Sequence, residues 1–138
     1  MILEHLNIVV SQLDETLAFY KVAFPHWRVR GQGTQTWYGT KRRWMHFGDD
    51  DQYITFNDSG TGFNRDLQTN DLGLSHFGYI THNIEALIER LDKAGFPIAK
   101  SGNNTPFRRN VYFIDPNGFE IEFIQYLSDL PKERNQYE

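Results

Sequence analysis

Two histidines occupy matching places in a sequence that repeats itself, and two carboxylates lie close together near its end. His5 begins the stretch HLNIVV, and His76 begins the similar stretch HFGYIT 71 residues later. Glu120 and Glu122 alternate with large apolar residues in the stretch FEIEF. Two neutral imidazoles and one carboxylate suit Fe(II), Mn(II), Zn(II), Ni(II) or Co(II), and they leave positions open for water or substrate. These residue types therefore indicate a site for one divalent metal ion.

The two carboxylates share one face of a predicted strand. The turn DPNG at residues 115–118 separates two apolar runs, which predicts a hairpin. Alternate residues of a strand point to opposite faces, so Ile121 and Phe123 are predicted to face a helix and the two glutamates to face away. A carboxylate on the inward side of a buried strand needs a partner, and a metal ion supplies one.

The repeat also predicts one helix in each half of the chain. Its apolar residues recur at i, i+4 and i+7, which is the spacing of one buried stripe. The matching positions are Leu13, Leu17, Tyr20 and Ala23 in the first half and Ile84, Ile88, Leu91 and Ala94 in the second. Ser11 with Asp14 is predicted to cap the first helix. Asn83 is predicted to cap the second helix and Gly95 to end it.

Strands are predicted after each helix. In the first half they cover Trp27–Arg30, about Thr36–Tyr38, Arg43–Phe47 and Tyr53–Asn57, and in the second about Pro97–Lys100, Asn110–Ile114 and Phe119–Tyr126. The chain then divides into a first module at 1–60, a linker at 61–73, a second module at 74–127 and a polar tail at 128–138. A half of roughly 60 residues buries too little surface to be comfortably stable alone. We therefore expect the two halves to pack together, with the sheet faces opposite the helices lining a shared space.

Composition argues against several classes of protein. The chain has no cysteine, which excludes a disulfide framework, a thiolate nucleophile and a cysteine metal site. The net charge of -4 argues against a nucleic-acid partner, because phosphate neutralisation needs a basic face. No apolar run approaches the roughly 20 residues that span a bilayer, and the first residues lack a signal-peptide pattern. We expect a cytoplasmic protein that acts on a small molecule, without nucleic acid or membrane.

The sequence resembles the vicinal oxygen chelate superfamily, which includes lactoylglutathione lyase, extradiol dioxygenases, fosfomycin-modifying thiol transferases and bleomycin-binding proteins. The resemblance covers nearly the whole chain through LEHLNIVV with LDETLAFY, LSHFGYI with IEALIERLDKAGF, and VYFIDPNGFEIEFIQ. It implies an α+β fold of two βαβββ modules that form an open half-barrel sheet around a metal-binding cleft, with helices on the outer face. It also implies one divalent ion held by His5, His76 and Glu122, and a homodimer that sometimes forms by exchange of modules.

The resemblance implies a metal-dependent enzyme, lactoylglutathione lyase-like, that binds a small substrate through two vicinal oxygens. One position departs from the lyase pattern. The lyase has a fourth ligand, a glutamate on the last strand of its first module, where this chain has Thr55, or Phe56 if the register differs by one. The missing carboxylate weakens the lyase interpretation, and the three remaining ligands are similar to those of the dioxygenases or thiol transferases, which leaves an Fe(II) extradiol-type dioxygenase as an alternative. A separate alternative is a non-catalytic binding protein of the bleomycin-resistance type, and the presence of the three ligands counts against it.

Strand positions place further candidates near the predicted site. The candidates for catalysis are Thr55, His46 and Tyr79, and the candidates for substrate binding are Arg109 and Tyr53. Strand parity allows His46 to face either way, and Glu120 is expected to lie beside the ligands without binding the ion. The aromatic residues Trp27, Trp37, Trp44 and Phe47 are expected in the core or in a dimer interface.

Overall fold

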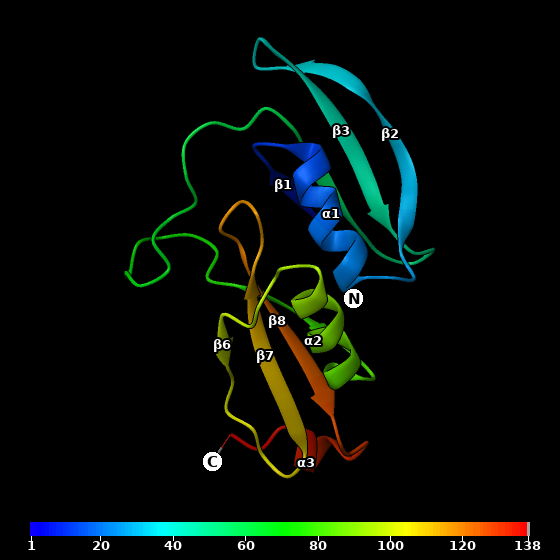
Figure 1. Cartoon of the computed structure of the whole chain (residues 1–138), viewed down its shortest axis with the longest axis vertical. Coiled ribbons are helices and arrows are strands. Elements are labelled where there is room, and N and C mark those ends of the chain that lie inside the picture. Colours follow the sequence, from blue (N-terminus) through cyan, green and yellow to red (C-terminus); the bar gives the residue numbers. More distant parts are fainter. Residues whose placement is uncertain (138) are drawn as a thin grey trace. The chain divides into compact units, whose positions relative to one another are not determined.

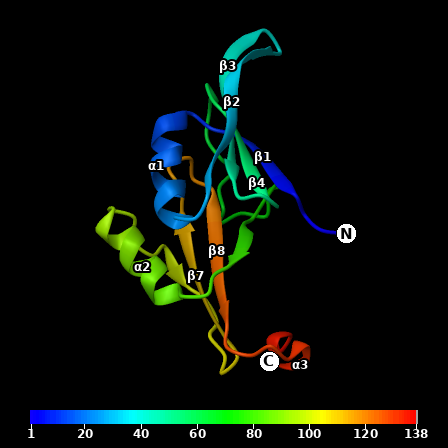
Figure 2. The ribbon, with the colours of Figure 1, turned by 90° about the vertical axis from the view of Figure 1, so that its right-hand side faces the viewer.

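The chain forms two compact units, each built from a strand, a helix and three further strands. The computed structural model describes residues 1–137, and the two units are Met1–Phe63 and Asn64–Glu138. In each unit the helix packs on one face of a four-stranded sheet (Figures 1 and 2). The α+β fold class that the repeat and the resemblance predicted is confirmed.

Unit 1 contains β1 (His5–Val9), α1 (Leu13–Ala23), β2 (Arg28–Trp37), β3 (Thr40–Gly48) and β4 (Tyr53–Asn57). Its strands lie in the order β1-β4-β3-β2, with β1 parallel to β4 and the other pairs antiparallel. The two strands predicted at 27–30 and 36–38 are one long strand, β2. Gly31 and Gly33 do not interrupt it, because they pair with His46 and Trp44 of β3.

Unit 2 contains β5 (Phe77–Ile80), α2 (Ile84–Lys93), β6 (Lys100–Ser101), β7 (Arg108–Ile114) and β8 (Glu120–Tyr126). Its order, β5-β8-β7-β6, repeats that of unit 1, with β5 parallel to β8. The edge strand β6 has two residues and lies slightly later than the strand predicted at 97–100. The polar tail contains a short helix, α3 (Pro131–Arg134).

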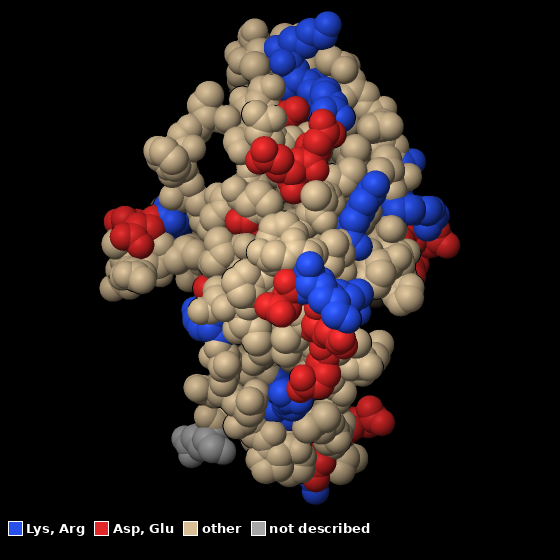
Figure 3. All heavy atoms as spheres, viewed as in Figure 1, with Lys and Arg blue, Asp and Glu red and all other residues tan. Residues whose placement is uncertain are grey.

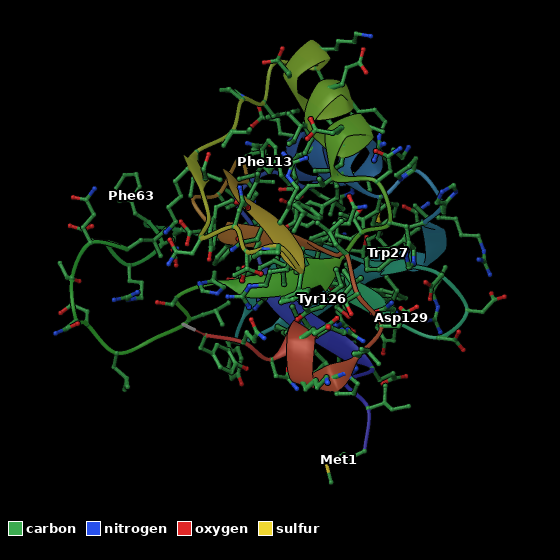
Figure 4. The ribbon with its side chains drawn as sticks, turned by 90° about the horizontal axis from the view of Figure 1, so that it is seen from below. Met1, Trp27, Phe63, Phe113, Tyr126 and Asp129 are labelled. Atoms are coloured by element: carbon green, nitrogen blue, oxygen red, sulfur yellow. The ribbon has the colours of Figure 1, made fainter. Side chains whose placement is uncertain are left out.

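Apolar side chains between helix and sheet hold each unit together. In unit 1 the ring of Tyr20 on α1 lies 4.8 Å from the ring of Phe56 on β4, and both side chains are fully buried. In unit 2 Leu91 on α2 and Ile121 on β8 are equally buried. Complete burial of side chains of this size stabilises the fold by about 1.5–3 kcal/mol each. Phe113 lies among the packed side chains of unit 2 (Figure 4). The sheet face opposite each helix is therefore free to carry polar groups.

The two helices begin differently. Asn83 caps α2 by accepting a hydrogen bond from the Ala86 N–H at 3.0 Å, and Gly95 follows the helix at a φ of 89°, as predicted. The Ser11–Asp14 capping pair predicted for α1 is wrong, because the residue before the helix is Gln12. The N–H of Leu13 donates instead to Asp58 Oδ1, at 3.2 Å.

Charged side chains of both signs are mixed on the surface. Figure 3 shows basic and acidic groups side by side on the visible face. Arg43 on β3 pairs with Asp14 on α1 at 3.1 Å, and Lys93 pairs with Glu89 within α2 at 2.7 Å. Among residues 1–137, no helix has both the length and the apolar character needed to cross a bilayer.

Candidate functional site

Two of the predicted metal ligands come together in unit 2. His76 Nε2 lies 3.3 Å from Glu122 Oε2. His76 directly precedes β5, and Gly78 pairs with Glu122 across the parallel β5–β8 ladder, so both side chains lie on the sheet face opposite α2. A Cβ at Gly78 would lie in ordinary contact with Glu122 Oε2, at 3.7 Å, and closer to Ile124 Cδ1, at 3.3 Å. An imidazole and a carboxylate are thus placed side by side by the register of the sheet.

Asn110 on β7 holds the other oxygen of this carboxylate. Its Nδ2 donates to Glu122 Oε1 at 2.7 Å, and Asn110 is only 4 % exposed. Asn110 is itself held in place, because its N–H donates to Asn104 Oδ1 at 3.1 Å and its carbonyl accepts from the Gly102 N–H at 2.9 Å. A Cβ at Gly102 would lie 2.1 Å from the Asn110 side chain, so only glycine leaves the amide this space. Oε2 of Glu122 remains directed at His76.

A second carboxylate lies on the other side of the His76 ring. Glu120 Oε1 lies 3.8 Å from His76 Nδ1 and 3.0 Å from Lys100 Nζ, and Glu120 is 8 % exposed. Histidines that bind metals usually donate their other ring N–H to a carboxylate or carbonyl, which fixes the tautomer. Glu120 lies beyond hydrogen-bond distance of Nδ1, so it acts on His76 through its charge, and Lys100 balances that charge. The donor set of unit 2 is therefore suited to a divalent ion at His76 Nε2 and Glu122.

Tyr112 completes the polar face of unit 2. It pairs with Glu122 in the antiparallel β7–β8 register, and its ring lies 5.4 Å from that of His76. Burial raises the pKa of the Tyr112 hydroxyl, and the charge of Glu122 and a hydrogen bond to it act in the same direction. The hydroxyl therefore stays protonated at neutral pH. Asn110 and Tyr112 were not predicted from the sequence as site residues. The predicted DPNG hairpin could have identified them, because its pairing puts both side chains on the same face as Glu122.

Two predicted site residues of unit 2 lie on the opposite face. Tyr79 pairs with the buried Phe123, and its ring contacts that of Phe77 at 6.0 Å, on the side covered by α2. Arg109 alternates with Asn110 along β7 and pairs with Glu85 of α2. The structure therefore does not bring the side chain of either residue to His76 and Glu122.

The predicted site residues of unit 1 lie together on the face of the sheet opposite α1. The ring of His5 stacks on Tyr53, its neighbour in the β1–β4 register, at 4.9 Å, and His5 Nδ1 lies 2.8 Å from Glu4 Oε2. Asn7 pairs with Thr55 as Gly78 pairs with Glu122 in unit 2. Thr55 thus holds the register position of Glu122.

A pocket of about 150 Å³ opens on this face of unit 1. His5, His46, Tyr53 and Thr55 all line it, so the parity of β3 turns His46 toward the other predicted residues. The indole rings of Trp37 and Trp44 line it as well, and the core position expected for these two is therefore wrong, while the alternative of a dimer interface stays a prediction. The pairing register of β2 with β3 determines which face of the sheet these two residues occupy, and their apolar character does not.

The two remaining aromatic residues behave differently. Phe47 is fully buried, as expected for the core. Trp27 stacks on Phe24 at 4.2 Å, and its Nε1 donates to Asp49 Oδ2 at 3.2 Å (Figure 4 labels Trp27). It packs at the end of the core and is not among the residues that line the pocket.

His46 has an environment that keeps its ring neutral. Burial lowers the pKa of His46, and the charges of Arg30 and His5 lower it further, while Glu4 acts in the opposite direction. Its ring lies 4.6 Å from that of Tyr53 and 5.1 Å from that of Trp44. A neutral imidazole in this pocket can accept a proton at neutral pH.

The predicted residues thus gather in two sets, one in each unit. His76 and Glu122 form the set in unit 2, and His5 lies with His46, Tyr53 and Thr55 in unit 1. Across residues 1–137, no three His, Cys, Asp or Glu side chains form a group arranged to hold a metal ion. Within unit 2, the predicted ligands His76 and Glu122 approach each other to 3.3 Å.

Comparisons with known proteins agree on the fold. The family model described as Glyoxalase/Bleomycin resistance protein/Dioxygenase superfamily matches residues 2–123. The chain therefore belongs to this superfamily. A search of curated proteins finds no match.

Solved structures of the same superfamily resemble the whole chain. The glyoxylase/bleomycin resistance protein/dioxygenase domain from Frankia sp. EAN1pec has a TM-score of 0.75 at 20 % identity, over 94 % of this chain and 95 % of that one. A glyoxalase family protein from Bacillus cereus has a TM-score of 0.75 at 15 % identity, over 91 % and 94 %. The fosfomycin resistance protein FosX from Listeria monocytogenes has a TM-score of 0.71 at 18 % identity, over 97 % and 99 %. At these identities the likeness shows a shared fold.

We predict that His46 titrates below the usual histidine midpoint. Its pKa is lowered from 6.5, so the unfolded chain takes up the proton first, and His46 reduces the free energy of unfolding as the pH falls below about 6.5. The measurement is the pH titration of the histidine Cε1 proton signals of metal-free protein by NMR, with His46→Gln used to assign the signal.

The Arg30→Gln variant tests the cause of this shift. Removal of the guanidinium charge should move the His46 midpoint upward, because Arg30 opposes protonation. Arg90→Gln, on the exposed side of unit 2, serves as the matched control and should leave the midpoint unchanged. A wild-type midpoint at or above 6.5 would contradict the buried environment of the ring.

Proposed function

We propose that this protein is a divalent-metal-dependent enzyme that binds a small substrate through two vicinal oxygens. The observation that carries the proposal is the approach of His76 Nε2 to Glu122 Oε2, 3.3 Å apart on a polar sheet face. His5 begins the equivalent strand of unit 1 and supplies the third donor. One ion per chain, held by His5, His76 and Glu122, follows from this set.

The surroundings of the pair support a metal site over a structural histidine. Glu122 is oriented by Asn110, which is how protein ligands of metals are commonly held, and the charge of Glu120 acts on the second nitrogen of His76. A mutant of FosX from Listeria monocytogenes, with a TM-score of 0.72 to this chain at 17 % identity, was solved with Mn(II) and 1S,2S-dihydroxypropylphosphonic acid, a compound with vicinal hydroxyls. That complex supports the same ion class and the same mode of substrate binding here.

The residues of this chain have distinct roles in the proposed reaction. A bound divalent ion supplies Lewis-acid stabilisation of negative charge on the substrate oxygens. Tyr112 keeps its hydroxyl proton and can donate it as a hydrogen bond beside Glu122. His46 is neutral and can accept a proton, and it pairs in register with Thr55, the position where the lyase has its glutamate. A lactoylglutathione lyase-like proton transfer is therefore the first reaction to assay, with His46 as the base.

Thr55 favours a second candidate, an Fe(II) extradiol-type dioxygenase. A threonine in the register position of Glu122 leaves a donor set of two histidines and one carboxylate, which is the set typical of non-haem Fe(II) oxygenases. Oxygen consumption with a catechol, dependent on Fe(II) and lost on oxidation of the iron, would favour the dioxygenase over the lyase-like enzyme. Failure to bind any divalent ion would instead favour a non-catalytic small-molecule binding protein.

We predict that His76→Ala, His5→Ala and Glu122→Gln each remove most metal binding. Each substitution deletes one donor of a three-donor set, so the remaining two hold the ion weakly. Elemental analysis of the purified proteins, followed by titration calorimetry with Mn(II), Fe(II), Ni(II) and Zn(II), measures the change. About one ion per chain is expected in the wild type.

His26→Ala is the matched control for the histidine variants. His26 is an exposed histidine outside both sets of site residues, and its removal should leave the stoichiometry unchanged. Unchanged metal content in His76→Ala would rule out the proposed ligand set. Loss in His76→Ala without loss in His5→Ala would show that the donors of unit 2 act without unit 1.

Thr55→Glu is expected to tighten metal binding. The substitution places a carboxylate in unit 1 at the register position that Glu122 holds in unit 2, which adds a fourth protein ligand. The affinity for Zn(II) or Ni(II), measured by competition with a chelator, should rise at least tenfold. Thr55→Gln is the control for size, and an equal gain in both variants, or none in either, would argue against Thr55 facing the ion.

Asn110→Leu is expected to weaken metal binding without unfolding the protein. Leucine has the same number and branching of side-chain heavy atoms as asparagine but cannot donate to Glu122 Oε1, and loss of a group that orients a metal ligand usually costs 10- to 100-fold in affinity. Calorimetric titration with the preferred ion measures the loss, and thermal unfolding of the metal-free variant reports its stability. Wild-type affinity in a folded Asn110→Leu protein would show that the amide does not orient the ligand.

A further inference from the structure

Two glycines of β2 make room for the indole ring of Trp44. A Cβ at Gly33 would lie 2.9 Å from Trp44 Nε1 and 3.0 Å from Cε2, and one at Gly31 would lie 3.8 Å from Cη2 and Cζ3. The indole therefore extends along the backbone of β2, with its nitrogen end over Gly33 and its outer edge over Gly31. Any larger residue at Gly33 would force the ring to move. One face of Trp44 is thus set against the sheet, and Trp44 also lines the pocket.

Four more rings line the same pocket, one of them the ring of His5, which stacks on Tyr53. Trp37, His46 and Tyr53 all line it, and the His46 ring lies between those of Trp44, at 5.1 Å, and Tyr53, at 4.6 Å. Arg42 covers Trp37 at 4.9 Å. Aromatic surfaces of this kind bind flat rings by offset or edge-to-face packing.

Besides the rings of His5, His46 and Tyr53, the wall carries the polar side chains of three amides and one threonine. Asn7, Gln35, Thr55 and Asn57 line the pocket, and no carboxylate does. Asn57 is fully buried; its Nδ2 donates to Asn7 Oδ1 at 2.6 Å, while its own Oδ1 has no hydrogen-bond partner. A buried amide oxygen without a donor is costly, so a ligand N–H or O–H that reaches it gains a hydrogen bond at little desolvation cost.

The volume of the pocket sets the size of its ligand. It measures about 150 Å³, which is the volume of an engineered protein cavity that binds benzene. One six-membered ring fills such a space. No carboxylate lines the pocket, His5 and His46 do, and Arg30 and Arg42 lie over the rings of Tyr53 and Trp37 at 4.5 and 4.9 Å, so a cationic substituent is disfavoured on the part that enters it.

We propose that the substrate of this enzyme carries an aromatic ring that bears no cationic group and has a hydrogen-bond donor, and that the ring binds in this pocket against Trp44. The proposal rests on the proposed function for the chelating end of the substrate, which must reach His5 at the border of the pocket. The ring end is bound by unit 1 alone and needs no metal ion.

The test uses the metal-free full-length protein, with EDTA present, and benzamide as the probe. Benzamide offers one ring and an amide N–H, and cyclohexanecarboxamide offers the same amide on a ring without π electrons. Saturation-transfer NMR and tryptophan fluorescence titrations give the two dissociation constants. We expect benzamide to bind at least tenfold more tightly, and nuclear Overhauser contacts should join its ring protons to the Trp44 indole.

Trp44→Leu should weaken benzamide binding at least tenfold, because it removes the stacking surface. Gly33→Ala should weaken it as well by displacing the indole, and it does so without changing any residue that lines the pocket. Trp27→Phe is the control, since Trp27 packs on Phe24 outside the pocket, and binding should be unchanged. A folded Trp44→Leu protein that binds benzamide normally, or equal affinity for the two carboxamides, would overturn the proposal.

These experiments test the proposed ring site and the proposed metal site separately. Benzamide binding that persists in a protein with no affinity for divalent ions would leave the ring pocket in place and remove the proposed enzyme function. Metal binding without any benzamide binding would keep the metal site and remove the ring as a feature of the substrate.

Discussion

Parallel pairing at one end of each sheet is the constraint on which the candidate site depends. The first strand of each unit lies beside its last strand, and the pairing of Asn7 with Thr55 and of Gly78 with Glu122 fixes which side chains emerge next to each histidine. Because side chains alternate, a slip of one residue would bury Glu122 under the helix and expose Ile121. The complete burial of Ile121 opposes that slip, so the hydrophobic core determines the position of the polar groups.

The same framework carries different chemistry in the two units. In unit 2 the face opposite the helix is ionic, with Glu120 and Glu122 on β8 and Lys100 on β6. In unit 1 the equivalent face is aromatic, and Tyr53 and Thr55 hold the register positions of the two glutamates. The repeat therefore provides two scaffolds with the same geometry. The residues that differ between them have different proposed roles: the carboxylates of unit 2 hold an ion, and the aromatic side chains of unit 1 bind a ring.

Much of this arrangement could be predicted from the sequence, because it depends on local signals. The 71-residue repeat and the alternation in FEIEF indicated two equivalent modules and a carboxylate on the polar face of the last strand, and the resemblance to the superfamily supplied the choice of Glu122 as the partner of His76. The face occupied by Arg109 follows from the alternation of side chains along β7. The predicted strand began at residue 110, so the prediction did not extend that alternation to Arg109. The aromatic wall could not be foreseen, since Gly31 and Gly33 resemble strand breakers until their pairing with β3 is known.

The short edge strand β6 has a consequence for how the carboxylate of Glu122 is kept in place. Only Lys100 and Ser101 form this strand, yet the neighbouring Gly102 N–H holds the Asn110 carbonyl, and Asn110 orients Glu122. Edges with few hydrogen bonds open at a lower free energy than the core of a domain. The orientation of the ligand is thus coupled to a local fraying equilibrium, and amide hydrogen exchange at Gly102 would report the fraction of molecules in which the carboxylate is preorganised.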